Sequence, residues 1–243
     1  MPIAQYLAMT GTEMAGNTVF PTHTAWLACH FSPGGQGLSN LPKWLPAGSL
    51  LILDDSTPMA NHDPAQIAQA LGACMRALQC VGLLLDFQRA GEEQARALVE
   101  YLCQTLPFPV AVSDLYAEGT DCAVFLPPIP PDTPMAAWLA RWTGREIWLD
   151  TAMDSQEIVL TEKGATATPL PFQACPEGGL ADRNLHCHYR VSLDDDKAVF
   201  TLWRTAADIA DQLAEAEALG VRAAVGLYQE LGSPPPKPEE GLV

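Results

Sequence analysis

Acidic side chains recur where short apolar segments of this chain end. Two carboxyl groups in one cleft can divide the work of a hydrolase between them, because burial keeps one of them protonated. Aspartate also begins many turns and caps many helices, which explains any single case. Five segments that end in this way favour a polar cleft. The acids are Asp54, Asp55, Asp86, Asp114, Asp150 and Glu230.

The segment before Asp86 shows how these acids would be held. Val81–Leu85 is a continuous apolar run, the pattern of a parallel strand that is covered on both faces. Gln88 follows Asp86 by two residues and is expected on the same side, since strand side chains alternate with a period of two. Asp86 and Gln88 are therefore the leading candidates for the centre of a site.

Eight such segments predict the strands of a barrel. Helical patterns lie between several of them, at residues 63–78, 91–106 and 205–219, and this alternation predicts a parallel sheet. Eight strands favour a closed (β/α)8 TIM barrel over a doubly wound sheet, with all carboxyl ends on one face. The expected strands are Ile3–Ala8, Ala25–Phe31, Ser49–Leu53, Val81–Leu85, Val110–Ser113, Cys122–Leu126, Glu146–Leu149 and Arg222–Tyr228.

One stretch, residues 155–204, departs from this alternation. It contains two pairs of alternating segments, each joined by a short turn, which predict antiparallel hairpins. We expect a small antiparallel β insertion between the seventh and eighth strands of a single TIM-barrel domain, residues 1–232. Residues 233–243 are rich in proline and acidic side chains, which predicts a flexible tail.

Composition limits the partners. Thirteen basic and twenty-nine acidic residues give a net charge of −16, which argues against nucleic acid and anionic membranes. Seven cysteines without a C-x-x-C pair are expected as small core residues in a reducing compartment. No apolar run is long enough to span a membrane, and the first residues lack the features of a signal peptide, so a cytoplasmic location is expected. The oligomeric state is left open.

Metal and cofactor motifs are weak. His186 and His188 are one residue apart on an expected strand, and His30 ends another, but a metal would need further ligands at matching geometry. Phosphate-binding and dinucleotide-binding glycine patterns do not occur. We expect no metal and no cofactor, and ordinary hairpin histidines.

The order of these segments resembles glycoside hydrolase family 18, the chitinase-like TIM barrels, and is closest to the bacterial branch linked to spore cortex and peptidoglycan. The strongest similarity lies in Val199–Leu213 and Ala218–Gly232, and it extends to Asp121–Leu126, Glu146–Leu149 and Val81–Gln88. The family's signature strand reads D-G-x-D-x-D-x-E. Here Gly82 and Asp86 match it.

The same alignment shows what this chain has lost. Val81 and Leu84 replace the first two acids, and Gln88 stands where the family has its general acid. A neutral amide cannot protonate a leaving oxygen, and general acid catalysis typically contributes about 10²–10⁴-fold. The aromatic floor of the family's sugar site corresponds here to Gln229, beside Tyr228.

The resemblance therefore implies a barrel that binds an N-acetylated sugar or peptidoglycan without hydrolysing it. One alternative is an active glycosidase on N-acetylglucosamine-containing glycans that uses displaced carboxylates. A second is a protein-interaction scaffold with a vestigial cleft. The expected catalytic positions are Asp86 and the inactive Gln88. The expected ligand-binding residues are Asp54, Asp55, Asp114, Tyr116, Asp150, Tyr228, Gln229 and Glu230.

Overall fold

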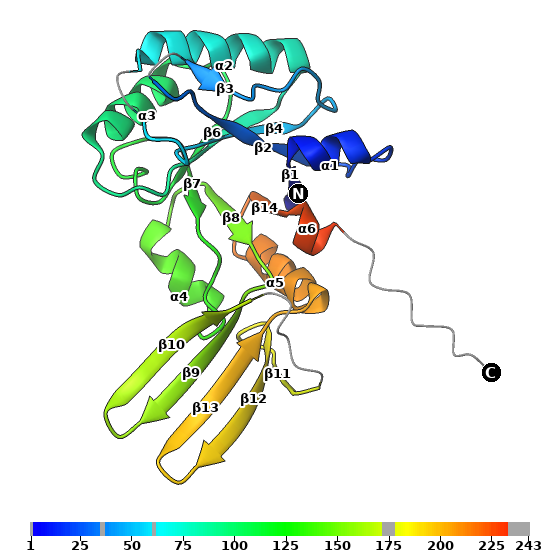
Figure 1. The fold of residues 1–243 in the computed structure, drawn as a ribbon, viewed down its shortest axis with the longest axis vertical. Coiled ribbons are helices and arrows are strands. Elements are labelled where there is room, and N and C mark those ends of the chain that lie inside the picture. Colours follow the sequence, from blue (N-terminus) through cyan, green and yellow to red (C-terminus); the bar gives the residue numbers. More distant parts are fainter. Residues whose placement is uncertain (1, 35–36, 60–61, 172–177, 233–243) are drawn as a thin grey trace, which may run out of the picture.

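The computed structural model describes residues 2–34, 37–59, 62–171 and 178–232, and its largest unit is a closed parallel barrel (Figure 1). Its strands follow the order β1-β14-β8-β7-β6-β5-β4-β2, and β1 also pairs with β2 in parallel, which closes the sheet. The barrel strands are β1 Ala4–Met9, β2 Thr24–Phe31, β4 Leu50–Asp54, β5 Gly82–Asp86, β6 Val110–Ser113, β7 Ala123–Leu126, β8 Ile147–Thr151 and β14 Ala223–Leu227. The predicted (β/α)8 TIM barrel is thus confirmed.

Alternation along each strand divides the apolar residues between two sides. Leu84 of β5 belongs to the cluster that fills the barrel, whereas its neighbours Leu83 and Leu85 belong to the cluster beneath the outer helices. Asp86 falls in the inward register with Leu84. Gly82 begins the same row, and an added Cβ would lie 3.1 Å from Leu50 and 3.3 Å from Trp148, so a glycine leaves these two side chains room inside the barrel.

The connections between the barrel strands are uneven. Two long helices cover the β4, β5 and β6 side of the barrel, and β3 turns back beside β2 (Figure 1). Residues 114–122, between β6 and β7, contain no helix. The remaining elements are α1 Gly11–Gly16, β3 Leu38–Ser39, α2 Pro64–Leu78, α3 Glu93–Thr105, α4 Met135–Leu139, the 3₁₀ helix Ala140–Trp142, α5 Ala206–Ala218 and α6 Tyr228–Leu231.

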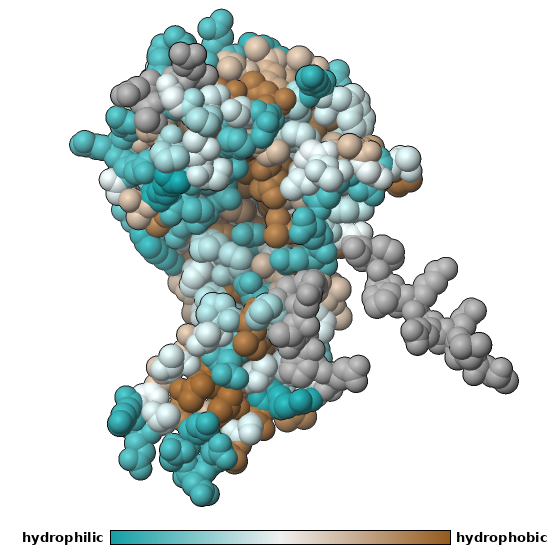
Figure 2. Space-filling view, viewed as in Figure 1, coloured by the Kyte–Doolittle hydropathy of each residue, from teal (hydrophilic) through white to brown (hydrophobic). Residues whose placement is uncertain are grey.

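A five-stranded antiparallel sheet, here called the β lobe, projects from the barrel between β8 and β14 (Figure 1). This is the insertion that the sequence predicts between the seventh and eighth strands. Apolar residues gather on the lobe (Figure 2), and Leu160, Val191 and Leu193 are exposed there. The lobe strands are β9 Ser155–Thr161, β10 Gly164–Leu170, β11 Leu180–Asp182, β12 Cys187–Asp194 and β13 Lys197–Trp203, in the order β10-β9-β13-β12-β11.

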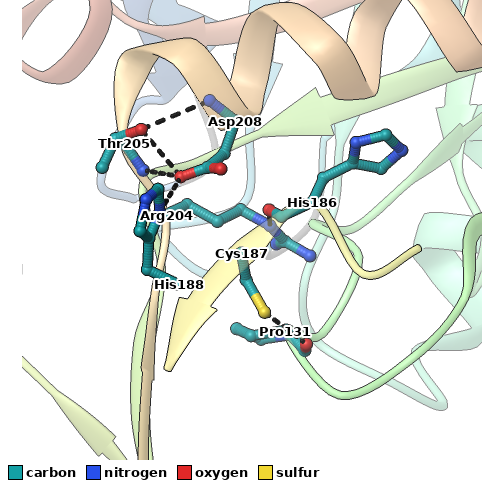
Figure 3. A network of polar contacts seen from close by, with 7 residues as sticks. All are labelled: Pro131, His186, Cys187, His188, Arg204, Thr205 and Asp208. Atoms are coloured by element: carbon teal, nitrogen blue, oxygen red, sulfur yellow. Dashed lines mark hydrogen bonds and ion pairs between the residues drawn. The ribbon is translucent and has the colours of Figure 1, made fainter. Parts of the chain in front are cut away.

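Arg204 joins the β lobe to the barrel (Figure 3). Its guanidinium is 2% exposed and donates to the carbonyl oxygens of His186, Ile129 and Pro130, which lie in the lobe and in the loop after β7. Three carbonyl acceptors compensate for the cost of burying this cation. The thiol of Cys187 adds a contact to Pro131 O in the same loop.

Two histidines of the lobe contact acidic side chains of α5. His188 Nδ1 lies 2.8 Å from Asp208 Oδ2, and the His186 ring contacts the Glu215 carboxylate. Asp208 also forms a capping box with Thr205 at the start of α5, the helix predicted over residues 205–219. Among the residues that the structure describes, no three His, Cys, Asp or Glu side chains are grouped as a metal site would require.

The cysteines differ in part from the expectation of unpaired core residues. Cys29, Cys80 and Cys187 are buried and free, as expected. Cys103 near the end of α3 and Cys122 before β7 form a disulfide, with their Cα atoms 6.4 Å apart. Their pairing depends on how α3 returns to the barrel, which spacing along the chain does not reveal. Cys175 and the predicted tail, 233–243, lie outside the described residues.

Helix length also bears on the membrane prediction. Within the described parts of the chain, every helix is too short or too polar to traverse a lipid bilayer.

Gly226 of β14 provides a test of how closely the strands approach. A Cβ there would lie 2.6 Å from Thr151 Oγ1 and 2.7 Å from Thr151 O on β8. We expect Gly226→Ala to lower the free energy of unfolding by about 1–3 kcal/mol, because the added methyl overpacks the closed barrel. Urea unfolding followed by circular dichroism measures this loss. Gly16→Ala is the matched control, since its Cβ would meet open space; equal effects of the two changes would contradict the packing argument.

Candidate functional site

The candidate site is a small cavity inside the carboxyl end of the barrel. Its volume is about 140 Å³, and Asp86 and Asp150 are the only ionisable side chains in its lining. The other lining residues come from β5 and β8 themselves, from five further barrel strands and from the residue after β8. They are Ala8, Leu27, Ile52, Leu84, Phe125, Thr151, Ala152, Val225, Gly226 and Leu227. Two carboxyl groups therefore share a mostly apolar surround.

Asp150 is the most perturbed acid of this group. It lies on β8 in register with Val225 of β14. Burial raises the pKa of Asp150 to about 8, and the charges of Asp86, Asp154 and Glu230 act in the same direction. At neutral pH the folded protein therefore holds a protonated carboxyl at the cavity wall.

Asp86 ends β5 beside Asp54 of β4, with which it is in register. Burial raises the pKa of Asp86 as well, and the charges of Asp54 and Asp55 add to the rise. The side-chain amide of Gln88 donates to Asp86 Oδ1, which favours the ionised form and partly opposes the other effects. Gln88 itself is exposed and lies just past the end of the strand.

Asp55 holds the chain that carries Gln88. Its carboxylate is 5% exposed and accepts the backbone N–H groups of Gln88 and Arg89, at 3.0 and 2.9 Å. The Arg89 guanidinium donates to Ser56 O, which ties the same two loops together. Asp55 is thus fully engaged with backbone and does not line the cavity.

Tyr116 supports the same segment from the other side. It is 2% exposed, its hydroxyl donates to Arg89 O, and it accepts the N–H of Glu92. The hydroxyl of Ser113 donates to Phe87 O at 2.7 Å. The structure therefore places Tyr116 beneath the loop after β5, away from the cavity lining.

The remaining predicted residues lie outside the lining of the cavity. Asp114 follows β6 and its N–H donates to Phe125 O, while Asp54 accepts the N–H of Ser56. Glu230 of α6 accepts the N–H of Met153, which brings its charge near Asp150. Tyr228 donates its hydroxyl to Asn17, and Gln229 is exposed. Of the ten predicted residues, Asp86 and Asp150 line the cavity.

Two residues escaped the sequence reasoning. Asp154 lies near Asp150, and burial raises the pKa of Asp154 while the Arg204 guanidinium opposes that rise. Asp154 could have been identified from its position, because it follows Asp150, the acid at the end of a predicted strand, by four residues. Arg204 gave no signal of its own, because its role depends on carbonyl groups of a loop more than seventy residues away in sequence.

The raised pKa of Asp150 predicts a pH dependence of stability. The unfolded chain releases this proton near pH ~4, whereas the folded protein keeps it to about pH 8. The folded state binds more protons in this window, so stability falls as the pH rises through it, by up to about 1.4 kcal/mol per pH unit for one proton. Asp150→Asn removes the ionisation and should flatten the slope between these values, as measured by urea unfolding.

The control for this prediction is Asp211→Asn, a change at an exposed acid on α5. Its stability should follow the wild-type slope. An Asp150→Asn protein that loses stability with pH as steeply as the wild type would show that Asp150 ionises normally.

The similarity of this chain to known proteins is one of fold alone. No family model matches the sequence, and no curated protein does. Solved structures do match. The spore cortex-lytic enzyme SleL from Bacillus cereus has a TM-score of 0.57 at 10% identity, and the match covers 96% of this chain and 72% of that enzyme.

Two chitinases give similar values. The chitinase from Chromobacterium violaceum has a TM-score of 0.57 at 10% identity, with 92% of this chain and 93% of that chain covered. The family 18 chitinase from Cycas revoluta in complex with (GlcNAc)3 has a TM-score of 0.58 at 11% identity, with 92% and 94% covered. The chain therefore has the barrel fold that is seen in these family 18 chitinases and in the spore cortex-lytic enzyme.

Proposed function

We propose that this protein binds an N-acetylated glycan, such as a chitin or peptidoglycan fragment, at the carboxyl face of the barrel and does not hydrolyse it. One observation carries the proposal: the exposed amide of Gln88 donates to Asp86, which lines the cavity, and Gln88 stands where the signature strand of the family has its proton donor. An amide bonds to sugar oxygens but does not protonate them.

The chemistry of Gln88 suits recognition. Its NH₂ group has two hydrogens, and one is used by Asp86 Oδ1. The second N–H and the carbonyl oxygen can bond to a hydroxyl or an acetamido group of a glycan. Asp55 holds the backbone of Gln88 and Asp86 accepts from its side-chain amide, which lowers the conformational entropy lost on binding.

The cavity suits one part of a glycan and not a whole oligomer. Its volume of about 140 Å³ is smaller than the roughly 300–1,000 Å³ of sites that enclose a small ligand. Leu84, Phe125 and Val225 give it apolar walls that accept a methyl group or a ring face. The other sugars would lie outside, along the exposed mouth.

Structural neighbours support a glycan ligand. A double mutant of the Cycas revoluta chitinase, in which a glutamate is replaced by glutamine and a glycine by tryptophan, was solved in complex with (GlcNAc)4. A chitinase barrel that carries such a replacement therefore still holds its oligomer. The likeness to the present chain is one of fold, so the ligand is part of our proposal.

Calorimetric titration with N-acetylglucosamine oligomers tests binding. We expect a measurable affinity at millimolar ligand that Gln88→Ala weakens about 3- to 10-fold, because one hydrogen bond of roughly 0.5–1.5 kcal/mol is lost. Gln69→Ala, at an exposed glutamine of α2, is the matched control and should bind as the wild type does. A wild-type protein that gives neither heat nor a thermal shift with these oligomers or with peptidoglycan fragments would rule out the proposal.

A second candidate, an active glycosidase, is favoured by the state of Asp150. With a pKa of about 8, this carboxyl is protonated at neutral pH and faces the cavity beside Asp86. A protonated acid beside a second carboxyl is the pairing that glycoside hydrolysis requires. In this case Asp150 would replace the missing glutamate as proton donor.

Turnover of the same oligomers separates the two candidates. If Asp150 is the donor, the wild type is active, its rate falls as the pH rises past about 8, and Asp150→Asn lowers the rate by about 10²-fold or more. If the protein is a binder, the wild type is inactive over the whole pH range, and oligomer affinity survives in Asp150→Asn. Product analysis by chromatography distinguishes these outcomes directly.

A further inference from the structure

A second cavity lies at the opposite end of the barrel. Its volume is about 370 Å³, and its lining includes Val110, Ala123 and Glu146, which mark the amino ends of β6, β7 and β8. Cys103 and Cys122, the two halves of the disulfide, also belong to this lining. Both cysteines are partly exposed, so a small molecule in the cavity reaches the sulfur atoms.

The disulfide lies beside two barrel strands, β6 and β7, that no helix connects. It joins α3 to the start of β7 and thereby encloses β6 and residues 114–121, which belong to a connection without a helix. In a regular α/β barrel, a helix packed on the outside of the sheet connects successive strands. Here the covalent bond takes that role. A loop of this length restricts the unfolded chain substantially.

The enclosed segment is bonded to the candidate site at its other end. Ser113, at the end of β6, donates to Phe87 O, and Tyr116 donates to Arg89 O. Phe87 and Arg89 flank Gln88 in sequence. One short strand therefore connects the cavity that holds the disulfide with the loop that presents the amide.

We propose that the Cys103–Cys122 disulfide is a redox modification site, opened by a small thiol that enters this cavity, and that its reduction loosens the loop that carries Gln88. A thiolate attacks one sulfur, the S–S bond breaks, and the other cysteine leaves as a thiolate that takes up a proton. A second thiol then attacks the mixed disulfide. The products are two free cysteines and one oxidised thiol pair.

The charge of the cavity selects the thiol. Three acids, Glu100, Asp121 and Glu146, line it, and the guanidinium of Arg145, which donates to Cys122 O, offsets only part of their charge. A thiol that carries a positive charge is attracted and an anionic thiol is repelled. The reductant class is therefore a cationic or neutral small thiol. The effect of reduction on glycan affinity rests on the proposed function, whereas the reduction itself does not.

Reduction under native conditions tests the site. Cysteamine, 2-mercaptoethanol and mercaptoethanesulfonate are compared at low salt, with rates normalised to those on an exposed peptide disulfide, and new thiols are counted by absorbance. We expect two thiols per chain, with cysteamine about fivefold or more faster than the sulfonate. Equal rates for the three thiols, or no reduction before global unfolding, would overturn the proposal.

Hydrogen exchange and melting measure the consequence. We expect reduction to lower the protection of the amides of residues 87–92 and to lower Tm by roughly 6–12 °C. The Cys103→Ser/Cys122→Ser protein should have the amide protection and the Tm of the reduced wild type, and adding reductant should change neither. Cys74→Ser should behave as the wild type does in both measurements. Unchanged exchange at residues 87–92 in fully reduced, folded protein would refute the link to the loop, whether or not any glycan binds.

Discussion

The parallel pairing of β1 with β2 is the constraint on which the structure depends. It joins the first and second strands of the chain after the sheet has passed through six others. Once the ring is closed, no barrel strand has an open edge on that side, and all carboxyl ends surround one small opening. Asp86 and Asp150, which are sixty-four residues apart in sequence, meet at one cavity for this reason alone. The closeness of the charges follows from closure and not from local structure.

This closeness gives the site its electrostatic character. The protein puts carboxyl groups in a mostly apolar surround and supplies few cations there, so repulsion is relieved by keeping a proton on Asp150 and an amide on Asp86. The proton removes the charge of Asp150, whereas the amide stabilises the charge that an ionised Asp86 carries. They also give the two candidate functions a common origin, because a neutral acid and a neutral amide differ mainly in whether the proton can be given away.

Much of the fold could be predicted from the sequence, because it depends on patterns that are local. Apolar runs such as Val81–Leu85 and the capping box at Thr205 and Asp208 correspond to strands and helices that the structure confirms. The site was less predictable. Position at a strand end suggested that Asp55 would face a ligand, but the side chain turns to two backbone N–H groups of the next loop.

Tyr116 and the disulfide show the same limit of prediction from the sequence. A tyrosine after a strand looks like a ligand contact, yet this one is buried beneath the loop it supports. The pairing of Cys103 with Cys122 requires α3 to return to the amino end of β7, and the burial of Arg204 requires three carbonyl groups from two distant segments. Such contacts depend on three-dimensional arrangement, which periodicity does not encode.

The β lobe enters and leaves the barrel at one point. The backbone N–H of Arg204 donates to Asp154 O at 3.1 Å, and Ser155 pairs with Trp203, so the whole excursion begins and ends between hydrogen-bonded neighbours. A segment with adjoining ends can be exchanged for a shorter or longer one without moving the strands on either side. Evolution can therefore vary the lobe as a separable module, while the carboxylates of the barrel keep their places.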